Sequence, residues 1–322
     1  MDYTSIELCA GAGGQALGLE HAGFRHLALV EIDSQACSTL KFNRPDWNVL
    51  QEDLRAFSGT QFRGVDLLGG GVPCPPFSVA GKQLGAEDER NLFPEALRIV
   101  EESKPRAVLF ENVRGLMASK FNGYRKYIER RLEDLGYTGS WSIVNAADFG
   151  VPQIRWRTTF TAFREDAYKY YSNGVVRNIR KRYVGETLHP YLKQKGWLKA
   201  DSWASCANAL APTIVGGSKK HGGPDLGPTR AKKAWQLLGI DAHGIADSPP
   251  ERDFQGMPRL TVEMAAAIQG FPDDWRFVGS KTQVYRQIGN AFPPPVARWL
   301  GKRIADALSK KIGAADILAT AN

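Results

Sequence analysis

Ser5-Ile6-Glu7-Leu8-Cys9-Ala10-Gly11-Ala12-Gly13-Gly14 is the stretch of this 322-residue chain that sets its fold class. Residues 5–9 form an apolar run that predicts a strand, and a helical pattern follows the glycines near residues 15–22. Glycines between a strand and a helix allow backbone N–H groups at the helix start to approach a ligand closely. The stretch therefore predicts the first strand and helix of an α/β sheet, with a ligand site at the turn.

The same alternation of strand and helix continues to about Phe163. Expected strands lie at residues 5–9, 27–32, 65–69, 107–111 and 158–162, and expected helices near 15–22, 34–43, 92–103 and 124–135. Such alternation predicts an α/β fold in which a parallel sheet has helices on both faces.

A basic insert interrupts this pattern. Residues 165–258 are rich in Gly, Pro, Lys and Arg, and they carry +5 of the total net charge of +8. Helical periodicity returns at residues 261–269 and 294–310. We therefore expect a catalytic domain formed by residues 1–164 and 259–322, with residues 165–258 as a separate domain. The basic charge favours a polyanionic partner.

Two carboxylates suit a ligand that contains ribose and adenine. Glu31 ends the second expected strand, 20 residues after Gly11, where a carboxylate can accept hydrogen bonds from both ribose hydroxyls. Asp53 could accept a hydrogen bond from an adenine amine. Gly11-x-Gly13-x-x-Ala16 also fits the dinucleotide fingerprint, so an NAD enzyme is an alternative.

A second constellation of residues supplies candidate chemistry. Cys74 follows the strand at 65–69, at the strand end where open α/β sheets bind ligands, and Pro73 restricts the backbone beside it. Glu111 ends the next strand, and Arg155 and Arg157 stand in a Gln-x-Arg-x-Arg motif. The polar turn at residues 285–291 precedes the last helix.

These motifs, in this order over residues 6–298, resemble the DNA (cytosine-5) methyltransferase family of the prokaryotic type. The resemblance implies a Rossmann-like S-adenosylmethionine-dependent methyltransferase sheet with a small, irregular target-recognition domain. It also implies that duplex DNA binds in the cleft between the two domains. In the family, the variable stretch after the Gln-x-Arg-x-Arg motif reads the DNA sequence, and the basic insert occupies that position here.

The resemblance also implies residue roles. Cys74 is the nucleophile that attacks carbon 6 of cytosine, Glu111 interacts with N3, Arg157 binds O2, and Arg155 orients Glu111. The residues implied for cofactor binding are Leu8, Ala10, Gly11, Gly13, Gly14, Glu31, Ile32, Asp53, Leu54, Pro73, Asn290 and Ala291. The candidate DNA-binding residues are Ser78, Lys82, Arg90, Thr213, Ser218, Lys219, Lys220, His221 and Arg230.

The DNA-binding candidates fall in two segments. Residues 75–90 follow the nucleophile and are expected to close over a base that is rotated out of the duplex. Residues 212–221 contain Thr213-Ile214, which matches a Thr-aliphatic pair in the family's recognition domain. The lysines after it could read guanine in the major groove or simply contact phosphates. Cys9 stands where the family usually has Phe, and Pro75 stands where Gln is common.

Partners and alternatives follow from the same residues. We expect double-stranded DNA as substrate, a monomeric cytoplasmic enzyme, and a cognate restriction endonuclease acting on the same site. The chain shows no secretory signal, no membrane span and no zinc or disulfide spacing among its four cysteines. An RNA cytosine-5 methyltransferase and a catalytically silent DNA-binding regulator remain alternatives.

Overall fold

The computed structural model describes residues 3–73, 91–172, 174, 179–216 and 226–309. The chain divides into two compact units. Unit 1 comprises Met1–Val144, Trp156–Val175 and Val296–Asn322, and unit 2 comprises Asn145–Arg155 and Val176–Pro295. The compact units thus assign residues 145–155 and 259–295 to unit 2, whereas the expected catalytic domain included them. The functional boundary at residues 165–258 stays a prediction.

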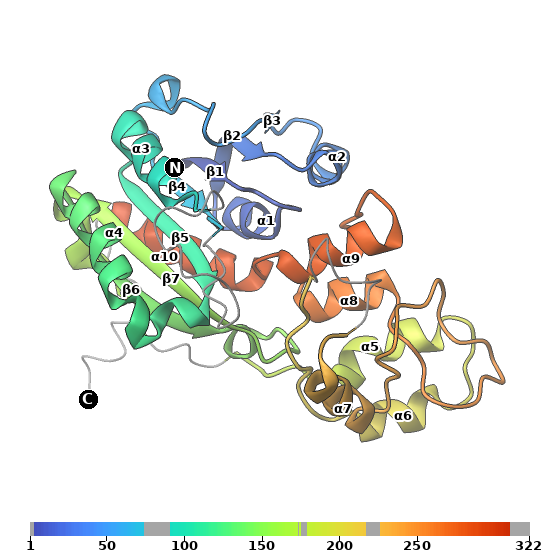
Figure 1. Cartoon of the computed structure of the whole chain (residues 1–322). Coiled ribbons are helices and arrows are strands. Elements are labelled where there is room, and N and C mark those ends of the chain that lie inside the picture. The colour runs from blue at the N-terminus through green and yellow to red at the C-terminus, as the bar shows by residue number, and fades with distance from the viewer. Residues whose placement is uncertain (1–2, 74–90, 173, 175–178, 217–225, 310–322) are drawn as a thin grey trace. The chain divides into compact units, whose positions relative to one another are not determined.

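Unit 1 is built on a seven-stranded sheet with the strand order β3-β2-β1-β4-β5-β7-β6 (Figure 1). The order reverses between β1 and β4, and at such a switch point the carboxyl ends of parallel strands leave space for a ligand. The strands are β1 (Tyr3–Leu8), β2 (Phe24–Glu31), β3 (Val49–Gln51), β4 (Leu67–Gly70), β5 (Ala107–Val113), β6 (Tyr137–Asn145) and β7 (Trp156–Arg164).

One part of the expected sheet is corrected by the structure. The strands β1 to β5 are parallel, but β7 pairs antiparallel with β5, in a register that places Glu111 opposite Thr159. Strands β3 and β6 were not expected. The first is only three residues long, and the second has mostly half-buried side chains rather than an apolar run. Strand direction depends on which partner a strand finds, which hydrophobic periodicity does not encode.

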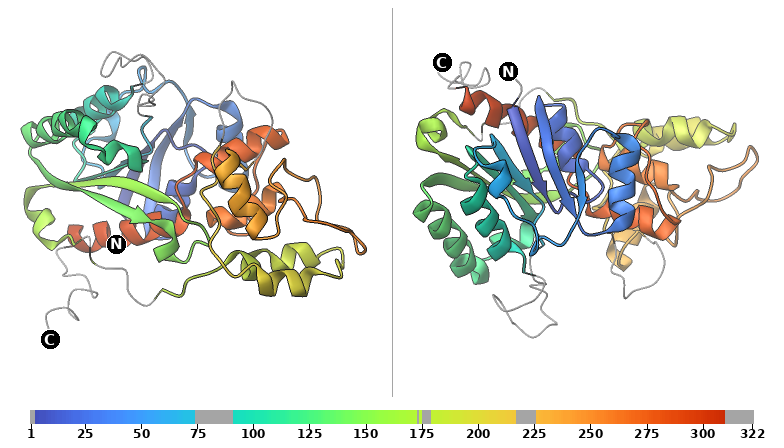
Figure 2. Two further views of the ribbon diagram at one scale, coloured as in Figure 1. Left: turned by 60° about the horizontal axis from the view of Figure 1, so that its bottom comes forward. Right: turned by 90° about the horizontal axis from the view of Figure 1, so that it is seen from above.

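Helices cover both faces of the sheet of unit 1, as expected. On one face, α3 (Phe93–Ser103) and α4 (Asn122–Asp134) bury residues such as Leu97 and Ile128 against alternate side chains of the strands. On the other face, α10 (Pro294–Leu308) packs closely on the end of α1 (Gly14–Glu20), because Gly301 approaches Leu19 and Ala22 (Figure 2). Helix α2 (Ser34–Asn43) follows β2.

The regular secondary structure described in unit 2 consists mainly of helices, although the insert showed only weak periodicity in sequence. Its apolar core contains Trp235, Leu188 and Met264, all fully buried. Its helices are α5 (Val184–Lys193), α6 (Ala200–Cys206), α7 (Thr229–Leu237), α8 (Val262–Gln269) and α9 (Lys281–Asn290). None of the helices in the described residues is long and apolar enough to cross a membrane.

Candidate functional site

The glycine-rich turn after β1 lies at the carboxyl edge of the sheet of unit 1. Gly11 has φ +53° and Gly13, the N-cap of α1, has φ +85°, so the turn uses backbone conformations that favour glycine. The Gly13 N–H donates to Ala10 O (3.0 Å), and the Ala10 N–H donates to Val30 O (3.0 Å). The turn is therefore tied to β2 and presents the start of α1 at the strand ends.

Glu31 ends β2 beside this turn and is buried. Its carboxylate accepts hydrogen bonds from the Gly11 N–H (2.7 Å) and the Asp33 N–H (2.8 Å). Burial raises the pKa of Glu31, and donation from the Asp33 and Gly11 N–H groups opposes that rise. Each carboxylate oxygen has a further acceptor site, so Glu31 can still accept two hydroxyl groups from a ligand.

Cys9 lies in the same turn and is a poor nucleophile. Burial raises its pKa to about 12, and the carboxylates Glu31 and Asp53 add to the rise. Its φ of +53° is unusual for a residue other than glycine. The thiol therefore stays protonated near neutrality and packs against the apolar core of unit 1.

Ile32, Asp53 and Leu54 extend the site along the ends of β2 and β3. The Ile32 side chain is 64% exposed. Asp53 accepts from the Arg55 N–H (2.9 Å) and pairs with the Arg55 guanidinium (3.0 Å), whereas Leu54 is buried. An exposed apolar side chain between two carboxylates suits a ligand with a flat apolar ring and polar edges.

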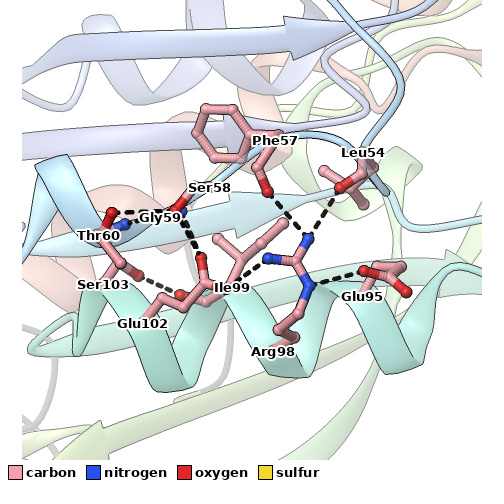
Figure 3. Close-up of polar contacts among 10 residues, drawn as sticks. All are labelled: Leu54, Phe57, Ser58, Gly59, Thr60, Glu95, Arg98, Ile99, Glu102 and Ser103. Atoms are coloured by element: carbon pink, nitrogen blue, oxygen red, sulfur yellow. Dashed lines mark hydrogen bonds and ion pairs between the residues drawn. The ribbon is translucent and has the colours of Figure 1, made fainter.

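Helix α3 holds the segment that follows Asp53 (Figure 3). The Arg98 guanidinium donates to the backbone carbonyls of Leu54 (3.1 Å) and Phe57 (2.9 Å), and it pairs with Glu95 and Glu102 of its own helix. Glu102 in turn accepts from the Gly59 N–H (2.7 Å). The segment from Leu54 to Gly59 is therefore attached to a rigid helix.

A buried polar cluster lies on the α1 side of the sheet. Glu7 of β1 is fully buried, and burial raises its pKa to about 8. A Cβ on Gly69 of β4 would collide with Glu7 Oε1 and lie 2.7 Å from Gln15 Nε2, so both side chains reach over this glycine. Neither Glu7 Oε1 nor the Gln15 amide has a hydrogen-bond partner among the described residues. The glycine is needed here because two polar side chains fill the space of a side chain.

The expected reacting centre begins at the ends of β4 and β5. The Asn112 amide donates to Val72 O (2.9 Å), which ties β5 to the backbone just before Pro73. Pro73 is exposed. The structure therefore places Glu111, the residue before Asn112, close to the chain that leads into the expected nucleophile.

Glu111 forms an ion pair with Arg157, with 2.9 Å between Glu111 Oε1 and Arg157 Nε. Arg157 lies opposite Val113 in the β5–β7 ladder, and Glu111 and Val113 point to the same face, so the pair is a diagonal contact across two antiparallel strands. Both side chains are largely buried, at 11% and 13% exposure. A largely buried carboxylate–guanidinium pair holds both groups in one orientation.

This pairing corrects one expectation, since Arg155 was expected to orient Glu111. The described ion pair of Glu111 is with Arg157. Arg155 is fully buried in unit 2, where its guanidinium donates to the carbonyls of Ile214 (2.8 Å), Gly289 (2.7 Å) and Ala291 (3.0 Å). Arg155 precedes β7 and belongs to unit 2, whereas Arg157 lies within β7 in unit 1, so the two arginines have different partners.

Arg155 belongs to a buried polar network that organises unit 2. Gln153 donates to Gln269 Oε1 (2.9 Å) and accepts from the Ile214 N–H (2.9 Å), and Gln269 donates to Ala291 O. The network joins the Gln-x-Arg motif, the Thr213-Ile214 pair and the final motif. These three stretches are far apart in sequence, and the network brings them together.

Asn290 is the exposed last residue of α9, and Ala291 is its buried C-cap. A Cβ on Gly216 would collide with Asn290 Oδ1, and a Cβ on Gly289 would collide with the Gly216 backbone. Close approach of these glycines holds the chain after Val215 against the end of α9. The position of Asn290 is therefore set by the same contacts that hold Gly216.

The described DNA-binding candidates of the insert differ in setting. The Thr213 hydroxyl donates to Ile154 O (2.6 Å), so its recorded contact is within unit 2. Arg230 is exposed in the first turn of α7. Several candidates lie outside the described residues, namely Cys74, Ser78, Lys82, Arg90, Ser218, Lys219, Lys220 and His221.

S-Adenosylmethionine fits the residues of unit 1. A Cβ on Gly11 would meet no described atom within 4 Å, so the turn borders open space. Glu31 offers two acceptor oxygens, Ile32 offers an exposed apolar surface, and Asp53 offers an acceptor at the adjacent strand end. A ribose, a flat adenine ring and its exocyclic amine match these groups.

Sequence reasoning missed several polar residues. Glu7 and Gln15 were not singled out, although a carboxylate within an apolar strand is a signal of a buried polar site. Gln269 was missed because nothing near it in sequence marks it. Arg114 and Trp156, discussed below, were missed because single exposed residues carry no periodicity.

Comparisons with known proteins cover nearly the whole chain. The family model described as C-5 cytosine-specific DNA methylase matches residues 3–306. The chain is 48% identical over 320 residues to the Type II methyltransferase M.NgoMIV of Neisseria gonorrhoeae, which covers 97% of this chain and 100% of that protein. It is 52% identical over 310 residues to the Type II methyltransferase M.NaeI of Lentzea aerocolonigenes, covering 94% and 75%.

The fold also has a counterpart among solved structures. A crystal structure of Spodoptera frugiperda DNMT2 has a TM-score of 0.65 to this chain at 18% identity, and it covers 94% of this chain and 99% of that one. At this level of identity the likeness concerns the fold alone.

Proposed function

We propose, from the premise that this chain belongs to the C-5 cytosine-specific DNA methylase family, how its own residues carry out the reaction. The chain is a DNA (cytosine-5)-methyltransferase, and S-adenosylmethionine is its methyl donor. The observation that carries the proposal is the largely buried Glu111–Arg157 pair at the carboxyl end of the sheet, beside the strand that leads to Cys74.

Carbon 5 of cytosine is a poor nucleophile, and the proposed residues activate it. The Cys74 thiolate adds to carbon 6, and the electron pair displaced from the ring double bond makes carbon 5 nucleophilic. Glu111 shares a proton with N3 and stabilises the charge that develops on the ring, while Arg157 binds O2 and keeps Glu111 in place. After methyl transfer, the proton on carbon 5 leaves with a base and the Cys74 thiolate is eliminated.

The residues proposed to hold the methyl donor lie mainly in the glycine-rich turn and at the neighbouring strand ends. In unit 1, Glu31 binds the ribose hydroxyls, Asp53 binds the adenine amine, and Ile32 packs on the ring. We also assign Asn290 and Ala291 to the methionine end of the methyl donor, as the family motifs imply. The remaining proposed contacts come from backbone and apolar groups of Leu8, Ala10, Gly11, Gly13, Gly14, Leu54 and Pro73. When bound, S-adenosylmethionine supplies an electrophilic methyl group on a positively charged sulfur.

The DNA substrate must present its cytosine outside the stack, at a cost of a few kcal/mol. We assign that step to residues 75–90, including Ser78, Lys82 and Arg90. Sequence reading is assigned to residues 213–230 of the insert, where Thr213, Ser218, Lys219, Lys220, His221 and Arg230 supply donors. Both relatives named above are Type II methyltransferases, which supports a role beside a restriction endonuclease of the same specificity. A cytoplasmic monomer is the form we propose.

Replacement of the nucleophile tests the mechanism. Cys74→Ser should abolish methyl transfer but retain binding of DNA and S-adenosylmethionine, because a serine hydroxyl is far less ionised than a thiol. DNA that contains 5-fluorocytosine should trap the wild-type enzyme covalently, since fluorine cannot leave as a proton does, and it should not trap the variant. Cys206→Ser, at an exposed cysteine of unit 2, is the matched control. Equal trapping of wild type and Cys74→Ser would remove Cys74 from the mechanism.

Bisulfite mapping of plasmid DNA methylated by the wild-type enzyme identifies its target. Methylation confined to one short sequence is the expected result. Methylation spread over unrelated cytosines would contradict a sequence-reading insert.

A further inference from the structure

Three exposed residues lie beside the Glu111–Arg157 pair in unit 1. Val113, the last residue of β5, is 54% exposed, and Trp156, the first residue of β7, is 39% exposed. Arg114 follows Val113 and is also exposed. Val113 pairs with Arg157 in the ladder, so these residues lie at the same end of the sheet as Glu111, with Trp156 on the opposite face of β7 from Arg157. Trp156 is the only tryptophan that is exposed among the described residues.

Arg114 and Trp156 contact each other directly. The Arg114 guanidinium lies over the Trp156 ring, 5.1 Å from its centroid. A cation–π contact uses none of the guanidinium N–H groups as hydrogen-bond donors, so they stay available to an acceptor. Arg114 forms no ion pair with any residue in the described ranges, whereas Arg157, Arg98 and Arg106 each pair with a carboxylate.

The backbone that carries Arg114 is held in place. Arg114 begins the short helix η3 (Arg114–Met117), whose Leu116 is fully buried. Arg125 of α4 donates to Leu116 O (2.6 Å) and Ala118 O (3.1 Å). The cation is therefore presented from a rigid turn, so little conformational freedom is lost when it binds a ligand.

We propose that Arg114, oriented by Trp156, binds a backbone phosphate of the DNA strand that carries the target cytosine. Three observations support this partner. The guanidinium is a good bidentate donor to phosphate, its charge complements the substrate, and Arg114 directly follows the strand that carries Glu111. A phosphate contact fixes the strand beside the flipped base without reading sequence. The inference rests on the proposed function, because it takes the Glu111 end of the sheet as the reacting centre.

The same two residues could instead bind a protein partner, or they could form a structural contact that only joins η3 to β7. A structural clip would alter thermal stability and leave the salt dependence of DNA binding unchanged. A phosphate contact releases counterions, so its loss lowers the slope of log K against log salt by about one unit. The salt slope therefore separates the two roles.

The experiment compares Arg114→Ala, Arg114→Gln and Arg114→Lys with the control Arg63→Ala. Arg63 is another exposed arginine of unit 1, but it precedes β4 and so lies toward the opposite edge of the sheet. Dissociation constants for a duplex with the mapped target site and for an unrelated duplex are measured at several salt concentrations. Binding of S-adenosylmethionine and the melting temperature are measured for each variant.

We expect Arg114→Ala and Arg114→Gln to lower the affinity for both duplexes alike, by about tenfold at low salt. Both variants should also lower the slope of log K against log salt by about one unit. Arg114→Lys should keep the slope because it keeps the charge. Trp156→Ala should lose part of the affinity for DNA. Trp156→Phe should keep that affinity because an aromatic ring remains under the guanidinium.

Three results would overturn the inference. They are a salt slope equal to that of Arg63→Ala, a loss confined to the target duplex, and an equal loss of S-adenosylmethionine binding. If the wild-type enzyme fails to methylate DNA, the proposed function fails. If it methylates one mapped site and Arg114→Gln behaves as Arg63→Ala, the inference about Arg114 alone fails.

Discussion

Among individual residues, Glu31 and Glu111 show how one side-chain type takes two roles. Both are buried carboxylates at the ends of parallel strands. Glu31 accepts from backbone N–H groups, which leaves oxygen sites for neutral hydroxyls, whereas Glu111 pairs with the guanidinium of Arg157. The partner of each carboxylate, and not its place on a strand, indicates which ligand it serves.

Removal of the Glu31 carboxylate should weaken the methyl donor's binding far more than DNA binding. Glu31→Ala removes two hydrogen bonds to a charged acceptor, each of which contributes about 1.5–3 kcal/mol, and also frees the Gly11 N–H that the carboxylate holds. Calorimetry with S-adenosylmethionine measures the loss. Asp46→Ala, at an exposed carboxylate after α2, is the control and should bind as the wild type does. Unchanged affinity in Glu31→Ala would show that Glu31 does not contact the ribose.

Among the secondary-structure elements, α3 has a second role besides covering the sheet. Its Arg98, Glu102 and Ile99 hold the chain between β3 and β4 by side chain-to-backbone contacts (Figure 3). Burial raises the pKa of Glu102, but hydrogen bonds from the Gly59 N–H and Arg98 outweigh it and hold that pKa below its usual range. The segment that starts at Asp53 therefore depends on a helix that contacts no proposed ligand.

Loss of the Arg98 guanidinium should reduce both stability and affinity for the methyl donor. Arg98→Ala leaves the Leu54 and Phe57 carbonyls without their donor, and we expect a loss of about 1–3 kcal/mol in the free energy of unfolding. The partly exposed ion pairs should add little to this loss. Chemical denaturation and calorimetry measure the two effects. Arg131→Ala is the control, because its pair with Glu101 at 3.7 Å is exposed. Equal behaviour of the two variants would show that α3 does not support the segment.

For the whole molecule, the buried Glu7 carboxyl makes stability depend on pH. Its pKa rises from 4.5 to about 8 on folding because of burial. The folded state therefore binds more protons than the unfolded state between these values, and stability falls as pH rises through this range. The contribution of the protonated Glu7 carboxyl to the free energy of unfolding is complete below pH 4.5 and is lost as pH rises through about 8.

A neutral isostere of Glu7 should remove this dependence. Glu7→Gln should melt above the wild type near pH 8, by a few degrees, and the difference should shrink toward pH 5. Scanning calorimetry from pH 5 to 8 measures it. Burial lowers the pKa of His26 to about 4, so protonation of His26 on acidification destabilises the folded protein. This effect is the same in the wild type and in Glu7→Gln, so it cancels when their melting temperatures are compared. Parallel melting curves across the range would show that Glu7 is ionised in the folded protein.

The order of residues along the chain was enough to predict the α/β fold class, the glycine-rich turn, the positions of Glu31 and Glu111 near strand ends, and the ordered motifs that identify the family. These features depend on strands, turns and helices that follow one another in sequence, and parallel strand ends meet at one edge of a sheet whatever the details of packing.

Other features of the fold and of the site depend on contacts between segments that are distant in sequence. The antiparallel direction of β7, the pairing of Glu111 with Arg157 in place of Arg155, the helices of the insert and the burial of Glu7 over Gly69 were not predicted. Each depends on which segments pack together after chain reversal, and on side chains that reach across strands. A local pattern does not contain that information, because hydrophobic periodicity indicates which face of an element is buried but not which partner buries it.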